Sequence, residues 1–171
     1  MKIQTLIHTA LVAEAKPIIG HFKLICKEKQ PYNLYEGEGI VLIVSGMGSE
    51  NTQKALLYAL DHYDVRKALN IGIAGCKDES IPKGTLFCTT HPHLGIPFAT
   101  LSSHQTAITN QANLQTTLVD MEAETFLSTL PSTIERYVFK VVSDHLEATI
   151  PIKGDVGNWI NKSIKQWGKY A

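Results

Sequence analysis

The stretch IVLIVSGMGSENTQKALLYALDHY at residues 40–63 decides the fold class. Its first five residues, Ile40–Val44, form a continuous apolar run, which is typical of a strand covered on both faces. Gly46 and Gly48 predict a tight turn, and the apolar residues that follow keep the spacing of one helix face. A buried strand, a glycine turn and an amphipathic helix in this order indicate a sheet with helices packed against it.

Strands and helices alternate along the rest of the chain. Apolar and β-branched runs predict further strands at residues 3–12, 23–28, 33–36, 68–73, 85–89, 98–102, 116–119 and 137–142. Helical periodicity predicts helices at residues 15–22, 121–130 and 156–168. The alternation predicts a single-domain three-layer α/β/α fold with a central mixed sheet, and we expect residues 1–171 to form that one domain.

Composition restricts the classes of partner. The 16 Lys and Arg residues balance the 16 Asp and Glu residues, so no excess positive charge marks the chain for nucleic acid or anionic lipid. No apolar run approaches the roughly 18–20 residues that span a bilayer. We therefore expect neither a nucleic-acid partner nor a membrane partner.

The three cysteines are too few and too scattered for a disulfide framework, which favours a reducing compartment such as the cytoplasm. The stretch at residues 2–15 partly resembles a secretory signal, but polar residues interrupt its apolar core. We interpret it as the first strand instead. Cys88, His91 and His93 have a loosely metal-like spacing without a fourth ligand, so we expect an ordinary loop there and no metal.

Three acids lie just after predicted strands or at predicted helix starts: Glu14, Glu122 and Asp144. Ligands on such a sheet bind beyond the carboxyl ends of the strands. A single acid there most simply caps a helix or lies in solvent. Three such acids with glycine turns between them favour glycosidic bond cleavage, which needs an acid for the leaving group, a base for water and a carboxylate for sugar hydroxyls.

Five segments carry a resemblance to a known family. They are, in order, Ala10–Glu14 (ALVAE), Ser45–Gly48 (SGMG), Asn70–Gly75 (NIGIAG), Val119–Ala123 (VDMEA) and Val142–Asp144 (VSD). The sequence resembles the nucleoside phosphorylase superfamily, and within it is most similar to the methylthioadenosine/S-adenosylhomocysteine nucleosidase branch. The similarity runs from about residue 3 to residue 165. It implies a nucleoside phosphorylase-like fold and cofactor-free hydrolysis of the N-glycosidic bond of a purine-type nucleoside.

The resemblance also implies roles for individual residues. Asp144 would be the general acid that protonates N7 of the leaving purine, and Ser143 would orient it. Glu122 would hold the ribose hydroxyls while Met121 packs against the sugar. Glu14 would activate the attacking water.

Further residues would line the site by the same resemblance. Met47 would do so from the turn between Gly46 and Gly48, together with the backbone at Ala74 and Gly75. Ile108 falls where the family's backbone holds the edge of the base. The resemblance implies a homo-oligomer, with a dimer favoured.

The chain departs from the family pattern in its middle. It is shortened between Leu86 and Leu118, where the family carries substrate-loop and subunit-contact residues. Ala107 stands where the family usually has a purine-stacking phenylalanine, and Ile73 where Ser or Thr is frequent. The sequence therefore indicates glycosidic chemistry more firmly than it indicates a substrate.

The residues favour water over phosphate as the nucleophile. Phosphate clamps prefer arginine, and neither Arg66 nor Arg136 adjoins a motif. Lys140 lies near the predicted acid, but lysine is a weaker geometric clamp, and Glu14 would repel phosphate. Other readings stay open: a purine or uridine nucleoside phosphorylase, a futalosine hydrolase, a non-catalytic nucleoside-binding relative, and a flavodoxin-like domain suggested by strand alternation alone.

Overall fold

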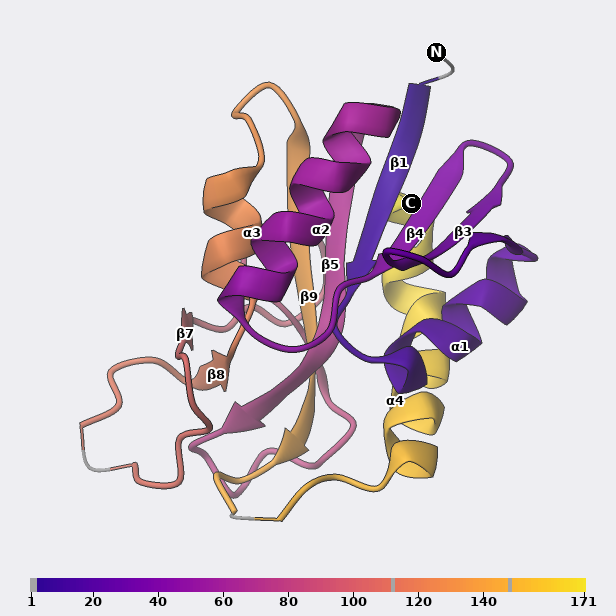
Figure 1. Cartoon of the computed structure of the whole chain (residues 1–171). Helices are drawn as coiled ribbons and strands as arrows, with labels where there is room; N and C mark the ends of the chain where they lie inside the picture. The colour runs from indigo at the N-terminus through magenta and orange to yellow at the C-terminus, as the bar shows by residue number, and fades with distance from the viewer. Residues whose placement is uncertain (1–2, 112, 148) are drawn as a thin grey trace.

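A nine-stranded mixed sheet forms the centre of the computed structural model, which describes residues 3–111, 113–147 and 149–171 (Figure 1). The parallel centre consists of β4 (Ile40–Val44), β1 (Ile3–Thr9), β5 (Asp64–Cys76) and β9 (Glu135–Asp144). These are the apolar runs of the sequence, and their burial on both faces explains why they lack a polar alternation.

Shorter strands extend this centre on both sides. On one side, β2 (Ile25–Glu28) and β3 (Asn33–Gly37) add antiparallel strands next to β4. On the other side, β6 (Leu86–Cys88) pairs with β9. Near its carboxyl end β5 also pairs with β8 (Leu118–Asp120), which in turn pairs with β7 (Leu101–Ser103).

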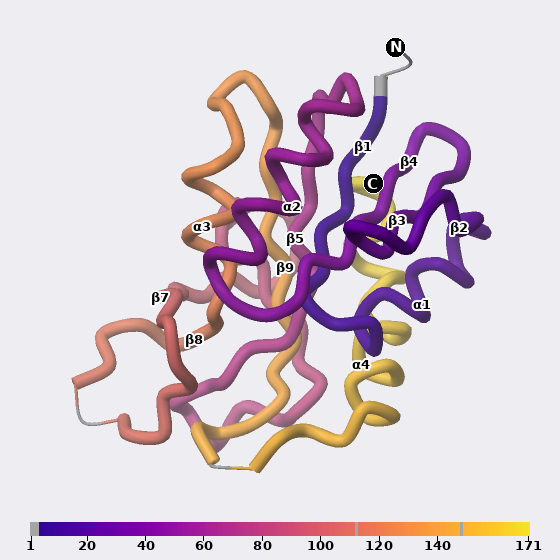
Figure 2. The backbone as a smooth tube through the Cα atoms, in the orientation of Figure 1, coloured from indigo at the N-terminus to yellow at the C-terminus, as the bar shows by residue number. Residues whose placement is uncertain are grey.

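Helices cover both faces of the sheet, as the two views show (Figures 1 and 2). The helices α1 (Val12–Phe22) and α4 (Lys153–Trp167) pack on one face, in a core that includes Ile18, Leu42, Leu69, Phe139 and Trp167. The helices α2 (Ser49–His62) and α3 (Ala123–Thr129) pack on the other, in a core that includes Leu6, Ile43, Leu56, Phe126 and Val138. A short 3₁₀ helix, η1 (Gly168–Tyr170), follows α4. The three-layer α/β/α fold with a mixed sheet is confirmed.

Two elements differ from the sequence prediction in ways that matter for the site. The strand β5 is longer than residues 68–73, because its end also pairs with β8 and β9. The helix α3 begins at Ala123 rather than at Met121, since the Asp120 carboxylate accepts the Ala123 N–H and leaves Glu122 outside the helix. Across the described part of the chain, no helix has the length and apolar character needed to cross a membrane.

Candidate active site

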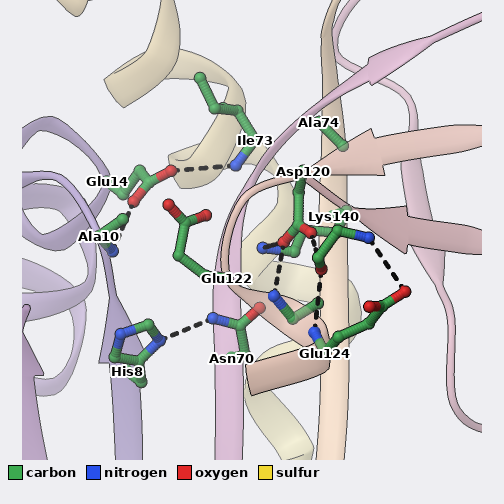
Figure 3. A network of polar contacts seen from close by, with 12 residues as sticks. His8, Ala10, Glu14, Asn70, Ile73, Ala74, Asp120, Glu122, Glu124 and Lys140 are labelled. Carbon is green, nitrogen blue, oxygen red and sulfur yellow. Dashed lines mark hydrogen bonds and ion pairs between the residues drawn. The ribbon is translucent and has the colours of Figure 1, made fainter. Parts of the chain in front are cut away.

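The predicted carboxylates lie at the carboxyl ends of the parallel strands. Glu14 is in the first turn of α1, directly after β1, and Asp144 ends β9. Glu122 lies between β8 and α3. Figure 3 shows the carboxyl groups of Glu14 and Glu122 turned toward one another over the end of β5. The sheet therefore brings together two acids that are 108 positions apart in the sequence.

The Glu14 carboxylate is held by backbone groups. Its Oε2 accepts hydrogen bonds from the N–H groups of Ala10 at 3.1 Å and Leu11 at 2.9 Å. Its Oε1 accepts one from the N–H of Ile73 on β5 at 3.0 Å. The side chain is only 2% exposed, so α1 and β5 fix its position between them.

Burial allows Glu14 to act as a base near neutral pH. Removal from water raises its pKa to about 7, and the nearby charge of Glu122 adds to this effect. The Lys140 ammonium and the backbone N–H donors act in the opposite direction, but they do not cancel the effect of burial. A carboxyl with this pKa exchanges protons readily at physiological pH.

A buried ion pair underlies these two acids. The Lys140 Nζ on β9 lies 2.8 Å from Asp120 Oδ2, and both side chains are almost fully buried. Asp120 also accepts hydrogen bonds from the Ser103 hydroxyl and the Ala123 N–H. Burial alone would lower the pKa of Lys140, but the charges of Asp120, Glu122 and Glu14 outweigh it and hold that pKa above its ordinary value.

Gly72 leaves the space in which Glu14 and Lys140 meet. It pairs with Lys140 across β5 and β9. A Cβ at Gly72 would lie 3.0 Å from Glu14 Oε1 and 3.1 Å from Lys140 Nζ. The Asp120–Lys140 pair was not predicted from the sequence. The sequence signal for this pair was Lys140, a lone lysine inside the apolar strand at residues 137–142. A lysine in such a strand cannot be buried without an acidic partner.

Glu122 connects the first glycine turn to α3. Its Oε1 accepts the N–H of Gly48 at 2.8 Å, and Gly48 adopts a positive φ of 92° that suits glycine. Burial raises the pKa of Glu122, as it raises that of Glu14. The bond aims one carboxylate oxygen at the turn that carries Met47.

Asp144 and Ser143 lie together beside the end of β5. The Ser143 hydroxyl is 2.7 Å from Asp144 Oδ2 and 3.3 Å from the Ala74 carbonyl oxygen. Asp144 Oδ1 accepts the N–H of Leu146 at 3.0 Å. A Cβ at Gly75 would lie 3.1 Å from that same oxygen. The half-buried Asp144 thus lies against the backbone of Gly75, and Ser143 contacts that of Ala74.

A buried histidine, His8, supports the first glycine turn, which carries Gly46 and Gly48. The His8 Nε2 lies 2.8 Å from Ser45 Oγ, which donates to the Gly46 carbonyl oxygen at 2.6 Å. Asn70 donates to His8 Nδ1 at 2.7 Å. Burial, with the nearby Lys140 charge, lowers the pKa of His8 to about 3, so His8 is neutral and donates through Nε2.

The other residues predicted for the site, Met47, Met121 and Ile108, lie in the turns and loops around the three acids. Met47 is 58% exposed in the turn between β4 and α2, and Met121 is half-buried next to Glu122. Ile108 is half-exposed in the segment between β7 and β8, which extends away from the sheet (Figure 1). Among residues 3–111, 113–147 and 149–171, no group of three or more His, Cys, Asp or Glu side chains could hold a metal ion.

Comparisons with solved structures show how widely this fold occurs. The Helicobacter pylori 5′-methylthioadenosine/S-adenosylhomocysteine nucleosidase, solved as a mutant with 5′-methylthioadenosine, matches with a TM-score of 0.84 and 13% identity over 99% of this chain and 98% of that one. The futalosine hydrolase of Helicobacter pylori matches with a TM-score of 0.84 and 14% identity over 99% and 97%. The Streptococcus pneumoniae 5′-methylthioadenosine/S-adenosylhomocysteine nucleosidase, with a transition-state inhibitor, matches with a TM-score of 0.81 and 13% identity over 95% of each chain.

Sequence comparison identifies the family. No curated protein matches the chain. The family model described as the phosphorylase superfamily matches residues 6–98, which is more than half of the chain. This range includes Glu14, the turn at Gly46–Gly48, and Gly72–Gly75, which lies within β5 rather than in the expected turn. With this match and the shared fold, the chain belongs to the phosphorylase superfamily.

Proposed function

We propose that the protein is a nucleosidase that hydrolyses the N-glycosidic bond of a purine-type nucleoside related to 5′-methylthioadenosine or S-adenosylhomocysteine. The observation that carries this proposal is Glu14. It is a buried carboxylate with a pKa of about 7, held by the N–H of Ile73. Gly75, which lies against Asp144, is two residues further along β5. At ~3.3 Å of rise per residue, base and acid contact backbone positions about 7 Å apart.

In the proposed reaction, Asp144 protonates N7 of the purine while the bond between the base nitrogen and C1′ breaks. The electron pair of that bond leaves with the base, and the sugar becomes oxocarbenium-like. Glu14 takes a proton from water as the water oxygen bonds to C1′. The products are the free base and the sugar with a hydroxyl at C1′. Ser143 supports this role for Asp144 through its 2.7 Å hydrogen bond.

The other buried charges fit the sugar. Glu122 uses one oxygen on the Gly48 N–H, so its second oxygen can accept the ribose hydroxyls. Lys140 offsets part of the negative charge of Asp120, Glu122 and Glu14, the three acids near it. Met121 and Met47 would pack against the sugar from the two adjoining turns.

Water fits this site better than phosphate does. The only cation against Glu14 among the described residues, Lys140, is already paired with Asp120. Arg66 pairs with Asp64 at the start of β5, and Arg136 donates to the carbonyl oxygens of Leu127 and Leu130. Both arginines therefore lie near the amino ends of their strands, whereas Glu14 follows the carboxyl end of β1.

A nucleoside panel, assayed with and without phosphate, tests the proposal. We expect free base and free sugar without any requirement for phosphate. The Asp144→Asn variant should release base about 10²–10⁴-fold more slowly, because it lacks the general acid. Phosphate-dependent formation of a sugar 1-phosphate would instead establish a phosphorylase. Binding of nucleosides without release of base would establish a non-catalytic binding protein.

We also propose that residues 1–171 act as one domain and that the protein is a cytoplasmic homodimer. Exposed apolar side chains support the dimer, since Val12 at the start of α1, Met47 in the first glycine turn and Ile152 just before α4 are 45%, 58% and 72% exposed. Light scattering should give twice the 18.9 kDa chain mass, and Ile152→Glu should lower it. A wild-type mass of one chain would exclude the dimer.

A further inference from the structure

A chain of three buried polar side chains lies beneath the first glycine turn. The side-chain amide of Asn70 on β5 donates to His8 Nδ1 on β1 at 2.7 Å (Figure 3). The His8 Nε2 donates to Ser45 Oγ at 2.8 Å, and the Ser45 hydroxyl donates to the Gly46 carbonyl oxygen at 2.6 Å. The three side chains are at most 8% exposed, so these bonds are shielded from competition by bulk water.

His8 lies on the side of the sheet that faces α2 and α3, where its neighbours are apolar. Leu6, two residues earlier in β1, belongs to that core, and the Phe126 ring of α3 stacks against the imidazole with centroids 5.9 Å apart. Because side chains alternate across a strand, an apolar residue at position 8 would continue this core. A polar ring here loses its hydration, and only its hydrogen bonds offset that loss. The histidine is therefore explained by the bonds that it makes rather than by packing.

The hydrogen-bond chain runs in one direction, from the core to the turn. Burial, with the nearby Lys140 charge, lowers the pKa of His8 to about 3, so the ring carries a single proton at neutral pH. The Asn70 amide donates to Nδ1, which leaves that proton on Nε2. Ser45 accepts it and turns its own hydroxyl proton to Gly46. The direction of the Gly46 carbonyl is thus specified from inside the sheet.

The turn depends on such a support because its glycines have wide backbone freedom. Gly46 and Gly48 have φ values of 84° and 92°, in the left-handed region that glycine tolerates. Only Met47 separates them, so the direction of the Gly46 carbonyl limits where the Gly48 N–H points. That N–H holds Glu122 Oε1 at 2.8 Å. His8 therefore acts on the Glu122 carboxylate through the turn.

We propose that His8 is a positioning residue that holds the turn Ser45–Gly48 in the form that aims Glu122 at the sugar hydroxyls. Asn70 orients the ring, and Ser45 transmits its position to the backbone. The inference rests on the proposed function for the role of Glu122 in holding the ribose. We expect the effect of His8 on recognition of the sugar hydroxyls rather than on proton transfer.

Two nucleosides that differ only in those hydroxyls test the proposal. 5′-Methylthioadenosine carries both, and its 2′,3′-dideoxy counterpart lacks both. In His8→Leu we expect kcat/KM to fall about tenfold for the first and less than about threefold for the second, because a hydrogen bond to a charged group contributes at least about tenfold. A ratio of the two kcat/KM values equal to that of the wild type would overturn the proposal, since a merely structural role changes both alike.

Ser45→Ala interrupts the same chain one step nearer the turn. It should lower the ratio to a similar extent as His8→Leu does. The double variant His8→Leu/Ser45→Ala should lower the ratio no further than the more affected single variant, because the two residues act in series. A combined loss equal to the product of the two single losses would show that they act independently and would overturn the proposal.

The C-terminal helix α4 offers a matched control. There the Trp167 Nε1 donates to Ser163 Oγ at 2.8 Å, and the Ser163 hydroxyl donates to the Ile160 carbonyl oxygen at 2.7 Å. Ser163 is 3% exposed, so Ser163→Ala removes a buried hydroxyl with the same kinds of donor and acceptor. It should lower stability as Ser45→Ala does and keep the ratio. An equal fall of the ratio in both variants would show that lost stability alone lowers it and would overturn the proposal.

Calorimetry makes the test independent of catalysis. If the wild type releases base from neither nucleoside, the proposed hydrolysis fails, and the dissociation constants of the same two ligands still test His8. A preference for 5′-methylthioadenosine that shrinks in His8→Leu but not in Ser163→Ala supports the positioning role. A preference that is the same in the wild type and in His8→Leu overturns it, and hydrolysis is then judged by its own assay.

Discussion

Glu14 shows how one buried side chain acquires its chemistry. A carboxylate that accepts three backbone hydrogen bonds would ordinarily have a depressed pKa and stay ionised at neutral pH. Here removal from water outweighs those bonds, and the pKa rises to about 7. The same backbone donors that hold the side chain still fix where its oxygens lie.

The raised pKa of Glu14 predicts the acidic side of the pH–activity profile. A general base works only when it is deprotonated, so kcat/KM should rise about tenfold per pH unit below pH 7 and level off above it. The Glu14→Gln variant should lose about 10²–10⁴-fold in activity together with this dependence. Initial rates of base release from pH 4 to pH 9 measure it. A wild-type profile that is flat between pH 5 and pH 7 would show that Glu14 is not the base.

At the scale of elements, β5 positions both halves of the site. Ile73 donates to Glu14, while Gly75 pairs with Asp144 across β5 and β9, just after a register shift. The extra pairing partners β8 and β9 hold this end of the strand from both sides. A small change at the end of β5 should therefore move the acid without unfolding the sheet.

Gly75→Ala tests this role of β5. The new Cβ would lie 2.9 Å from Leu146 Cδ2 and 3.1 Å from Asp144 Oδ1, so the Asp144 carboxylate must shift. We expect kcat to fall at least tenfold, because misplaced catalytic groups lose much of their effect. The matched control is Gly20→Ala in α1, where a Cβ meets no atom within 4 Å. Full activity in Gly75→Ala would contradict the placement of the acid.

The ion pair between β8 and β9 predicts a larger effect on stability. Lys140→Met leaves Asp120 buried without its counter-charge and should lower the free energy of unfolding by about 3–5 kcal/mol. The double variant Asp120→Asn/Lys140→Met should regain most of this loss but remain inactive. Lys83→Met, which breaks the exposed pair with Glu147, should cost less than about 1 kcal/mol. Urea unfolding measures all three, and equal losses for Lys83 and Lys140 would refute this assignment.

At the scale of the whole molecule, the burial of Glu14 lowers the stability of the folded protein at pH values above the pKa that Glu14 has in the unfolded chain. The folded pKa of about 7 exceeds the ordinary value of 4.5, so the protein binds this proton more tightly when folded. The stabilising effect of the proton is complete below pH 4.5 and is lost as the pH rises to about 7. Stability is thus lowered in the range where the base is active.

This linkage predicts how the whole protein responds to pH. The stability of Glu14→Gln relative to wild type should increase by about 3 kcal/mol between pH 4 and pH 8, since one pKa unit corresponds to about 1.4 kcal/mol. In Glu50→Gln the trend should have the opposite sign, because Lys54 lowers the pKa of Glu50. Urea unfolding at the two pH values measures both differences. A difference for Glu14→Gln that does not change with pH would disprove the raised pKa.

The sequence predicted the layers of the fold and the positions of three acids, because strand runs and glycine turns follow local rules. It placed Ile40–Val44 to the residue, and it placed Glu14 and Asp144 at strand ends. It did not reveal that Lys140 pairs with Asp120, since that contact depends on which strands become neighbours.

The donors that hold the acids belong mainly to the main chain. Glu14 is fixed by the N–H groups of residues 10, 11 and 73, Glu122 by that of residue 48, and Asp144 in part by that of residue 146. Any amino acid except proline supplies an N–H there. These positions can therefore diverge in side chain over evolution while the acids keep their places, and mutational scanning of residues 10, 11 and 73 should find proline the least tolerated substitution.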